Sequence, residues 1–119
     1  MKSNTSLATS LLEVRTDKVN LPIKLADILY IKGLDKRTLV CFIDQKRLET
    51  RHSLKWYGKR LPAPEFYRCH DSFIVHNRYV EGTCGNHFLL KDATTYIPIS
   101  RRKKEASKRS FELFILTSA

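Results

Sequence analysis

The stretch FYRCHDSFIVHNRYV, residues 66–80, carries more information about fold and function than any other part of this chain. It places Arg68 and His70 at alternate positions of a predicted strand, with Ser72 beyond them, so these side chains share one face. A second stretch, ISRRKK at residues 99–104, puts four consecutive cations directly after another predicted strand. Nucleic-acid recognition needs both features, because cations bind phosphates while donors and acceptors probe base edges. Together the two stretches predict a DNA-binding domain.

The charge balance of the chain supports an anionic partner. The 119 residues include 22 Lys and Arg against 12 Asp and Glu, which gives a net charge of +10. Such an excess raises the association rate and the non-specific affinity for an anionic polymer or surface. Charge alone does not distinguish DNA from RNA or from a membrane surface.

Composition also restricts the class of protein. Residues 11–119 are predicted to form a single domain with its own core, after a disordered N-terminus over residues 1–10, since 42% of the chain is apolar. Three cysteines, an odd number without a Cys-x-x-Cys pair, argue against a disulfide framework and favour the cytoplasm. No apolar run approaches the roughly 18 residues of a membrane span, and the N-terminus is a poor signal peptide.

Short apolar segments at close spacing predict a mainly β fold. The predicted strands cover residues 11–15, 21–25, 28–32, 39–43, 46–52, 66–70, 73–80, 87–91 and 95–99, with a turn over residues 82–85. One helix is expected after Ser53, a suitable N-cap, and before Pro62. Ser100 is a candidate cap for a second helix through Arg109, whereas residues 111–116 fit a helix or a strand equally well.

The order of these segments resembles the LytTR DNA-binding domain of bacterial response regulators. The resemblance covers about residues 11–105 and depends on DILYI at 27–31, SLKWYGKRL at 53–61, FYRCHDSFIVHNRYV at 66–80 and IPISRR at 97–102. It implies an elongated fold of small antiparallel sheets with short helices. It also implies that loops, rather than a recognition helix, enter successive major grooves of bent DNA.

The resemblance assigns DNA contacts to three places in the chain. These are the turn with Asp35, Lys36 and Arg37, the position of Asp71, and Arg101 after the motif serine. The candidate DNA-binding residues are therefore Lys36, Arg37, His70, Asp71, Arg101, Arg102, Lys103 and Lys104. Arg37 could instead be a solvated hairpin residue, His70 a structural histidine, and Lys103 and Lys104 part of a solvated face.

Two positions depart from the LytTR pattern. Asp71 stands where relatives usually have Arg, Lys or Asn, and His76 stands where they usually have Asn, which here follows as Asn77. A carboxylate is repelled by phosphate but can accept a hydrogen bond from cytosine N4 in the major groove. Either Asp71 therefore reads a base, or this loop contributes less to DNA binding than in relatives and is held by Arg68 or Arg78.

Other functions are weaker alternatives. A metal nuclease or hydrolase using His70, Asp71, His76 and His87 lacks a second carboxylate, and Cys84-x-x-His87 is half a zinc site without a partner pair. An RNA or single-strand module could stack bases on Tyr30, Tyr67, Tyr79 and Tyr96. Membrane-surface binding needs an amphipathic basic helix, which only residues 101–116 could form.

The sequence therefore predicts a non-catalytic, sequence-specific binder of double-stranded DNA in bacterial transcription regulation, without cofactor or metal and without a membrane partner. The resemblance implies binding to paired DNA repeats, with a dimer on DNA. It also leaves room for an upstream regulatory domain or a partner kinase pathway that this chain does not contain.

Overall fold

The structure is a computed structural model that describes residues 10–118. Most elements are short strands, as the sequence predicts, and the mainly β fold class is confirmed. The strands are β1 (Leu11–Arg15), β2 (Asn20–Lys24), β3 (Ile28–Leu34), β4 (Arg37–Phe42), β5 (Arg47–Thr50), β6 (Phe66–His70), β7 (Phe73–His76), β8 (Val80–Cys84), β9 (His87–Leu90) and β10 (Tyr96–Pro98). The helices are α2 (Leu54–Arg60) and α3 (Lys104–Thr117), with the short 3-10 helices η1 (Leu25–Asp27), η2 (Asn77–Tyr79) and η3 (Arg101–Lys103).

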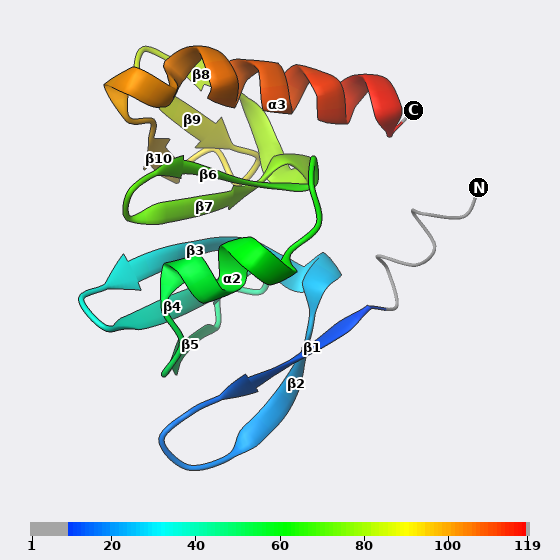
Figure 1. The fold of residues 1–119 in the computed structure, drawn as a ribbon. Helices are drawn as coiled ribbons and strands as arrows, with labels where there is room; N and C mark the ends of the chain where they lie inside the picture. The colour runs from blue at the N-terminus through cyan, green and yellow to red at the C-terminus, as the bar shows by residue number, and fades with distance from the viewer. Residues whose placement is uncertain (1–9, 119) are drawn as a thin grey trace.

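The strands form three antiparallel sheets (Figure 1). The central sheet has five strands in the order β5-β4-β3-β7-β6, the hairpin β1-β2 lies at one end of the molecule, and the sheet β10-β9-β8 lies beside α3 at the other. Pro98 lies in β10, an edge strand, where a missing backbone N–H costs no ladder bond. The described residues measure 38 × 36 × 25 Å, so the body is flattened rather than elongated.

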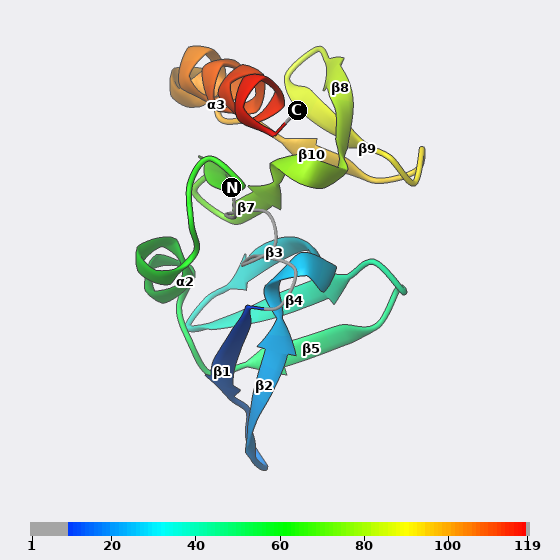
Figure 2. The ribbon, with the colours of Figure 1, turned by 90° about the vertical axis from the view of Figure 1, so that its right-hand side faces the viewer.

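Strands β3 and β7 separate two hydrophobic clusters. Ile31 of β3 and Ile74 of β7 belong to the cluster under α2 and the β1-β2 hairpin. Tyr30 and Val75 instead pack into the cluster under α3 and the three-stranded sheet β10-β9-β8. Successive side chains of a strand point to opposite faces. The five-stranded sheet is therefore the middle layer of the domain, and Figure 2 shows the other elements above and below it.

The predicted helix boundaries are partly right. Ser53 caps α2, and its hydroxyl accepts a hydrogen bond from the Trp56 N–H at 3.1 Å. Ser100 precedes η3 but makes no capping bond with its side chain, so the predicted cap is wrong. The helix that follows does not end at Arg109, because α3 continues through the ambiguous segment to Thr117.

The predicted strand over residues 73–80 is interrupted. It ends at His76, and η2 turns the chain because the Asn77 side chain is buried and donates to the Pro64 carbonyl at 2.7 Å and to Ser110 Oγ at 3.1 Å. Strand β8 then runs through Cys84, so the predicted turn at 82–85 occurs later, at Gly85, whose φ is +60°.

The expected disordered N-terminus lies outside the described residues except for Ser10, whose carbonyl accepts the Leu25 N–H at 3.1 Å. Within residues 10–118, neither helix has the length and apolarity needed to cross a membrane.

His76 should make the stability of the protein depend on pH. Its Nδ1 lies 2.7 Å from the Ile28 carbonyl and its ring stacks on Phe66 in the core, where burial lowers its pKa from 6.5 to about 4. Between these two values the unfolded chain binds a proton that the folded protein does not. The free energy of unfolding should therefore fall by about 3 kcal/mol as the pH drops through this window.

Urea denaturation at pH 7 and pH 4.5 measures this dependence. His76→Gln should show a clearly smaller decrease than the parent, while His87→Gln, a change at an exposed position on β9, should keep the parent's decrease. Equal decreases in both variants would show that His76 is not responsible.

Candidate nucleic-acid interface

Four turns from distant parts of the chain lie along one edge of the molecule. They are the β1-β2 turn, the β3-β4 turn, the β6-β7 turn and η3, all on the left-hand side of Figure 1. We call this row the loop edge and define it as residues 16–19, 35–37, 71–72 and 101–104. Single contacts tie each turn to the next: Arg37 to Asp17, Gly33 N–H to the Ser72 carbonyl at 2.7 Å, and Arg102 to Asp71.

The β3-β4 turn presents two cations, and one of them forms ion pairs. Asp35 adopts a positive φ of 25°, which closes the tight turn between the strands. Lys36 is exposed at its tip. Arg37 is half-buried: its Nη1 lies 2.9 Å from Asp17 Oδ1 and 3.6 Å from Glu49 Oε2. The hydrogen bond to Asp17 raises the pKa of the Arg37 guanidinium, a group that is cationic in proteins in any case.

The β6-β7 turn is held by side chains that bind its backbone. His70 Nδ1 accepts the Ser72 N–H at 3.0 Å, and Arg68 donates from Nη2 to the Asp71 carbonyl at 2.7 Å. The geometry of His70 matches the structural alternative for this residue. Arg68 therefore holds this loop, as one of the two expected cations, whereas the Asp71 carboxylate pairs with Arg102 at 3.0 Å, a contact that was not expected. Sequence spacing could not indicate a partner 31 positions away.

The segment after β10 places the basic run beside β6. The Ser100 N–H donates to the Cys69 carbonyl at 2.9 Å, and Lys103 Nζ donates to the Arg68 carbonyl at 3.3 Å. Arg101 is exposed, and its side chain makes no ion pair within the described part of the chain. It lies just before α3, where free backbone N–H groups and the helix dipole favour an approaching anion.

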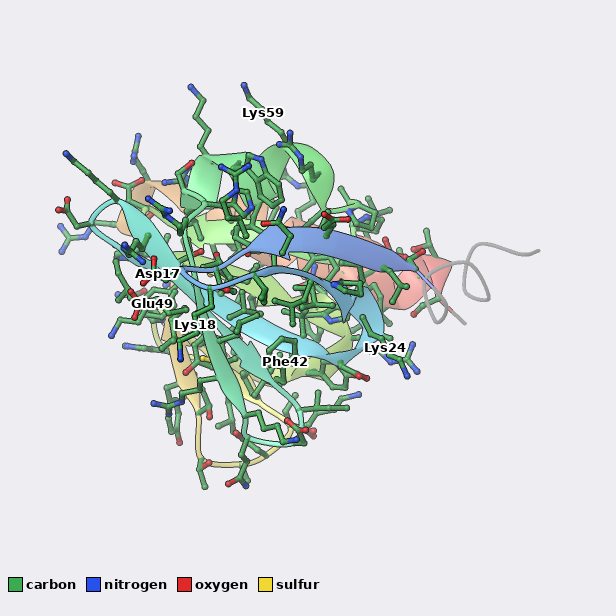
Figure 3. All side chains as sticks on the ribbon, turned by 90° about the horizontal axis from the view of Figure 1, so that it is seen from below. Asp17, Lys18, Lys24, Phe42, Glu49 and Lys59 are labelled. Atoms are coloured by element: carbon green, nitrogen blue, oxygen red, sulfur yellow. The ribbon has the colours of Figure 1, made fainter. Side chains whose placement is uncertain are left out.

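Three charged residues at or beside this edge do not stand out in the sequence. Asp17 in the β1-β2 turn contacts Arg37 and lies 3.8 Å from the Nε of Arg51, while Glu49 of β5 contacts the same Nη1 of Arg37. Figure 3 labels Asp17 and Glu49 close together, far from Lys24. Nothing in the local pattern indicates these contacts, because they depend on how the first hairpin packs against the central sheet.

The residues of the alternative functions are not brought together. Across residues 10–118, no three His, Cys, Asp or Glu side chains are grouped as metal ligands, and Cys84 and His87 are cross-strand partners at a hairpin end. Tyr30 and Tyr67 pack into the core, and Tyr79 donates its hydroxyl to the Ala26 carbonyl at 2.6 Å. Only Tyr96 of the four tyrosines is largely exposed, so they form no common stacking platform.

Comparison with known proteins identifies the family to which this fold belongs. The family model of the LytTr DNA-binding domain matches residues 18–112. The chain therefore belongs to the LytTR family of DNA-binding domains, which act in response regulators. Among solved structures, it is similar to the LytTr DNA-binding domain of a response regulator from Bacillus cereus, with a TM-score of 0.69 and 24% identity over 86% of this chain and 96% of that one. A search of curated proteins gave no match.

Proposed function

We propose that this domain recognises a specific sequence in double-stranded DNA by inserting the loop edge into the major groove. The observation that carries the proposal is the convergence of the four segments of the loop edge, which lie far apart in the sequence and include Lys36, Arg37, Asp71 and Arg101, on one edge of the molecule. Turns of this size fit a major groove about 12 Å wide. The largest extent of the described residues, 38 Å, is close to one helical turn of B-DNA, so both ends of the edge can reach the same face of a duplex.

The residues of the loop edge have different roles in this proposal. Arg101 and Arg37 read base edges, because a guanidinium can donate two hydrogen bonds to guanine O6 and N7. Lys36, Lys104 and the partly engaged Arg102 and Lys103 bind phosphates, which orients the protein without selecting a sequence. His70 supports the β6-β7 turn through the Ser72 N–H.

The protein acts as a non-catalytic transcription regulator in the bacterial cytoplasm. Paired DNA repeats would hold two copies, in line with the regulatory role of the family. Phosphorylation or another signal would then reach the domain from an upstream domain or a partner pathway outside this chain.

Selection of bound sequences from a random duplex library, with single-stranded competitor at near-physiological salt, tests the proposal. We expect a short motif that recurs at a spacing of about one helical turn. The affinity for that motif should fall with salt at a log–log slope of about −5 if about six phosphates are neutralised. Effective competition by the single strand, without a recovered motif, would favour the RNA or single-strand alternative.

Replacing Arg101 by alanine should weaken binding to the selected motif by about 1–3 kcal/mol, the usual cost of losing a base-reading arginine. The matched control is Lys24→Ala, which removes a cation from β2, away from the loop edge in Figure 3. Fluorescence anisotropy with the labelled duplex measures both. Equal affinities for Arg101→Ala and the parent would remove Arg101 from the interface.

Asp71 should select a cytosine. Its Oδ1 is bound to Arg102, which leaves Oδ2 to accept a hydrogen bond from cytosine N4. In Asp71→Asn the amide can pair with adenine N6 and N7, so the preferred base at one position of the motif should change from cytosine towards adenine. Repeating the selection with this variant measures the change. An unchanged motif would mean that Asp71 only holds Arg102.

A further inference from the structure

The ion pairs of this strongly basic chain are concentrated at the loop edge. Four are present among residues 10–118, and each includes Arg37, Asp17 or Asp71. Two of the four join Asp17 of the β1-β2 turn to Arg37 at the start of β4 and to Arg51 just after β5, and a third joins Arg37 to Glu49 of β5. The carboxylates are thus paired with arginines at the place where an anionic partner would bind.

Asp17 is held in position by the turn that carries it. The Thr16 hydroxyl accepts the Lys18 and Val19 N–H groups at 3.3 and 3.1 Å and donates to the Val19 carbonyl at 2.8 Å. The base of the turn is joined to the central sheet, because the Arg51 N–H donates to the Arg15 carbonyl at 2.9 Å. The carboxylate therefore projects from a defined turn towards Arg37.

The register of the central sheet explains why a carboxylate is needed there. Thr38 is paired with Thr50, so continuing the antiparallel register by one residue places Arg37 opposite Arg51. Like charges directly opposite one another on two strands repel. Asp17 Oδ1 contacts both guanidinium groups, at 2.9 and 3.8 Å, and neutralises part of this repulsion.

The ion pairs of Arg37 leave two of its nitrogens available to bind a base. Both carboxylates approach Nη1, and a guanidinium carries five N–H donors, so Nε and Nη2 keep donors that can point to guanine O6 and N7. A guanine edge is uncharged. A phosphate at the same place would lie beside the negative charges of Asp17 and Glu49 and would be repelled.

We propose that Asp17 is a specificity-determining positioning residue of the interface: it orients Arg37 towards a base edge and discourages its use on phosphate. This inference rests on the proposed function. It assigns a role to the β1-β2 turn of the loop edge, and Asp17 lies just before the stretch, residues 18–112, that matches the LytTR family model. The ion pair is exposed, with 38% and 64% of the two side chains accessible, so its effect is on selectivity rather than on folding.

The test compares the complete chain with Asp17→Asn on two duplexes of equal length, the selected motif and a random sequence, by fluorescence anisotropy over a salt series. Asp17→Asn should bind the random duplex about two- to fivefold more tightly, the usual effect of one exposed charge pair. Its log–log salt slope there should steepen by about 0.9, for one additional phosphate contact. Affinity for the motif should not rise, and discrimination at the base read by Arg37 should weaken.

Two further variants separate this role from a general gain of charge. Glu112→Gln removes the same charge from an exposed position on α3 and should leave the motif-to-random ratio as in the parent. In an Arg37→Ala background the effect of Asp17→Asn should shrink to that of Glu112→Gln. An Asp17→Asn variant that behaves like Glu112→Gln, or an effect that persists without Arg37, would overturn the proposal.

The same titrations identify a failure of the proposed function itself. If the parent binds the motif and the random duplex equally well, the domain is not a sequence-specific reader, and the role of Asp17 falls with it. If the parent prefers the motif and only the Asp17→Asn result differs from expectation, the proposed sequence-specific DNA recognition is supported and Asp17 is only a surface charge.

Discussion

The pairing of β3 with β7 is the interaction on which the rest of the structure depends. It joins residues more than 40 positions apart, as in the pair Ile31 and Ile74, and it creates one sheet with a hydrophobic cluster on each face. Without it the hairpins at the two ends of the molecule would have no common layer to pack on. The same ladder, continued by the Gly33 N–H and the Ser72 carbonyl, brings the β3-β4 and β6-β7 turns to the same end of the sheet. The edge that we propose as the DNA reader is thus a direct result of strand register.

The electrostatics of this edge are more balanced than the net charge of +10 suggests. In the described residues, the carboxylates that form ion pairs are gathered beside Arg37 and Arg102. A uniformly basic surface binds any duplex through its phosphates. Carboxylates beside selected arginines reduce that indiscriminate attraction while leaving guanidinium donors for base edges. The domain therefore combines an overall positive charge with carboxylates that weaken phosphate binding at the arginines proposed to read bases.

Local signals and long-range contacts explain which predictions succeeded. The capping hydroxyl of Ser53 and the apolar spacing that follows are local, so the position of α2 could be read from the sequence. The length of α3 could not be read from the sequence, because residues 111–116 become helical where Phe111 packs against Phe88 of the three-stranded sheet β10-β9-β8. The contact of Arg68 with the β6-β7 turn could be expected because the two are neighbours in sequence, whereas the pairing of Asp71 with Arg102 could not, since Arg102 reaches it only after the chain has completed a whole sheet. His76 and Asn77 departed from the family pattern without disturbing the fold, because both find buried partners.

The sequence by itself determined the mainly β class, the family and the segments that supply the turns, because periodicity, capping residues and motif order are properties of neighbouring residues. It also indicated an anionic partner through its net charge, which is read without a structure. Only the tertiary structure decided which of the cations are free and which are paired, and that the β1-β2 turn lies beside Arg37. The physical reason is that an ion pair depends on distances of 3 to 4 Å between side chains, and strand pairing sets these distances between residues far apart in the chain.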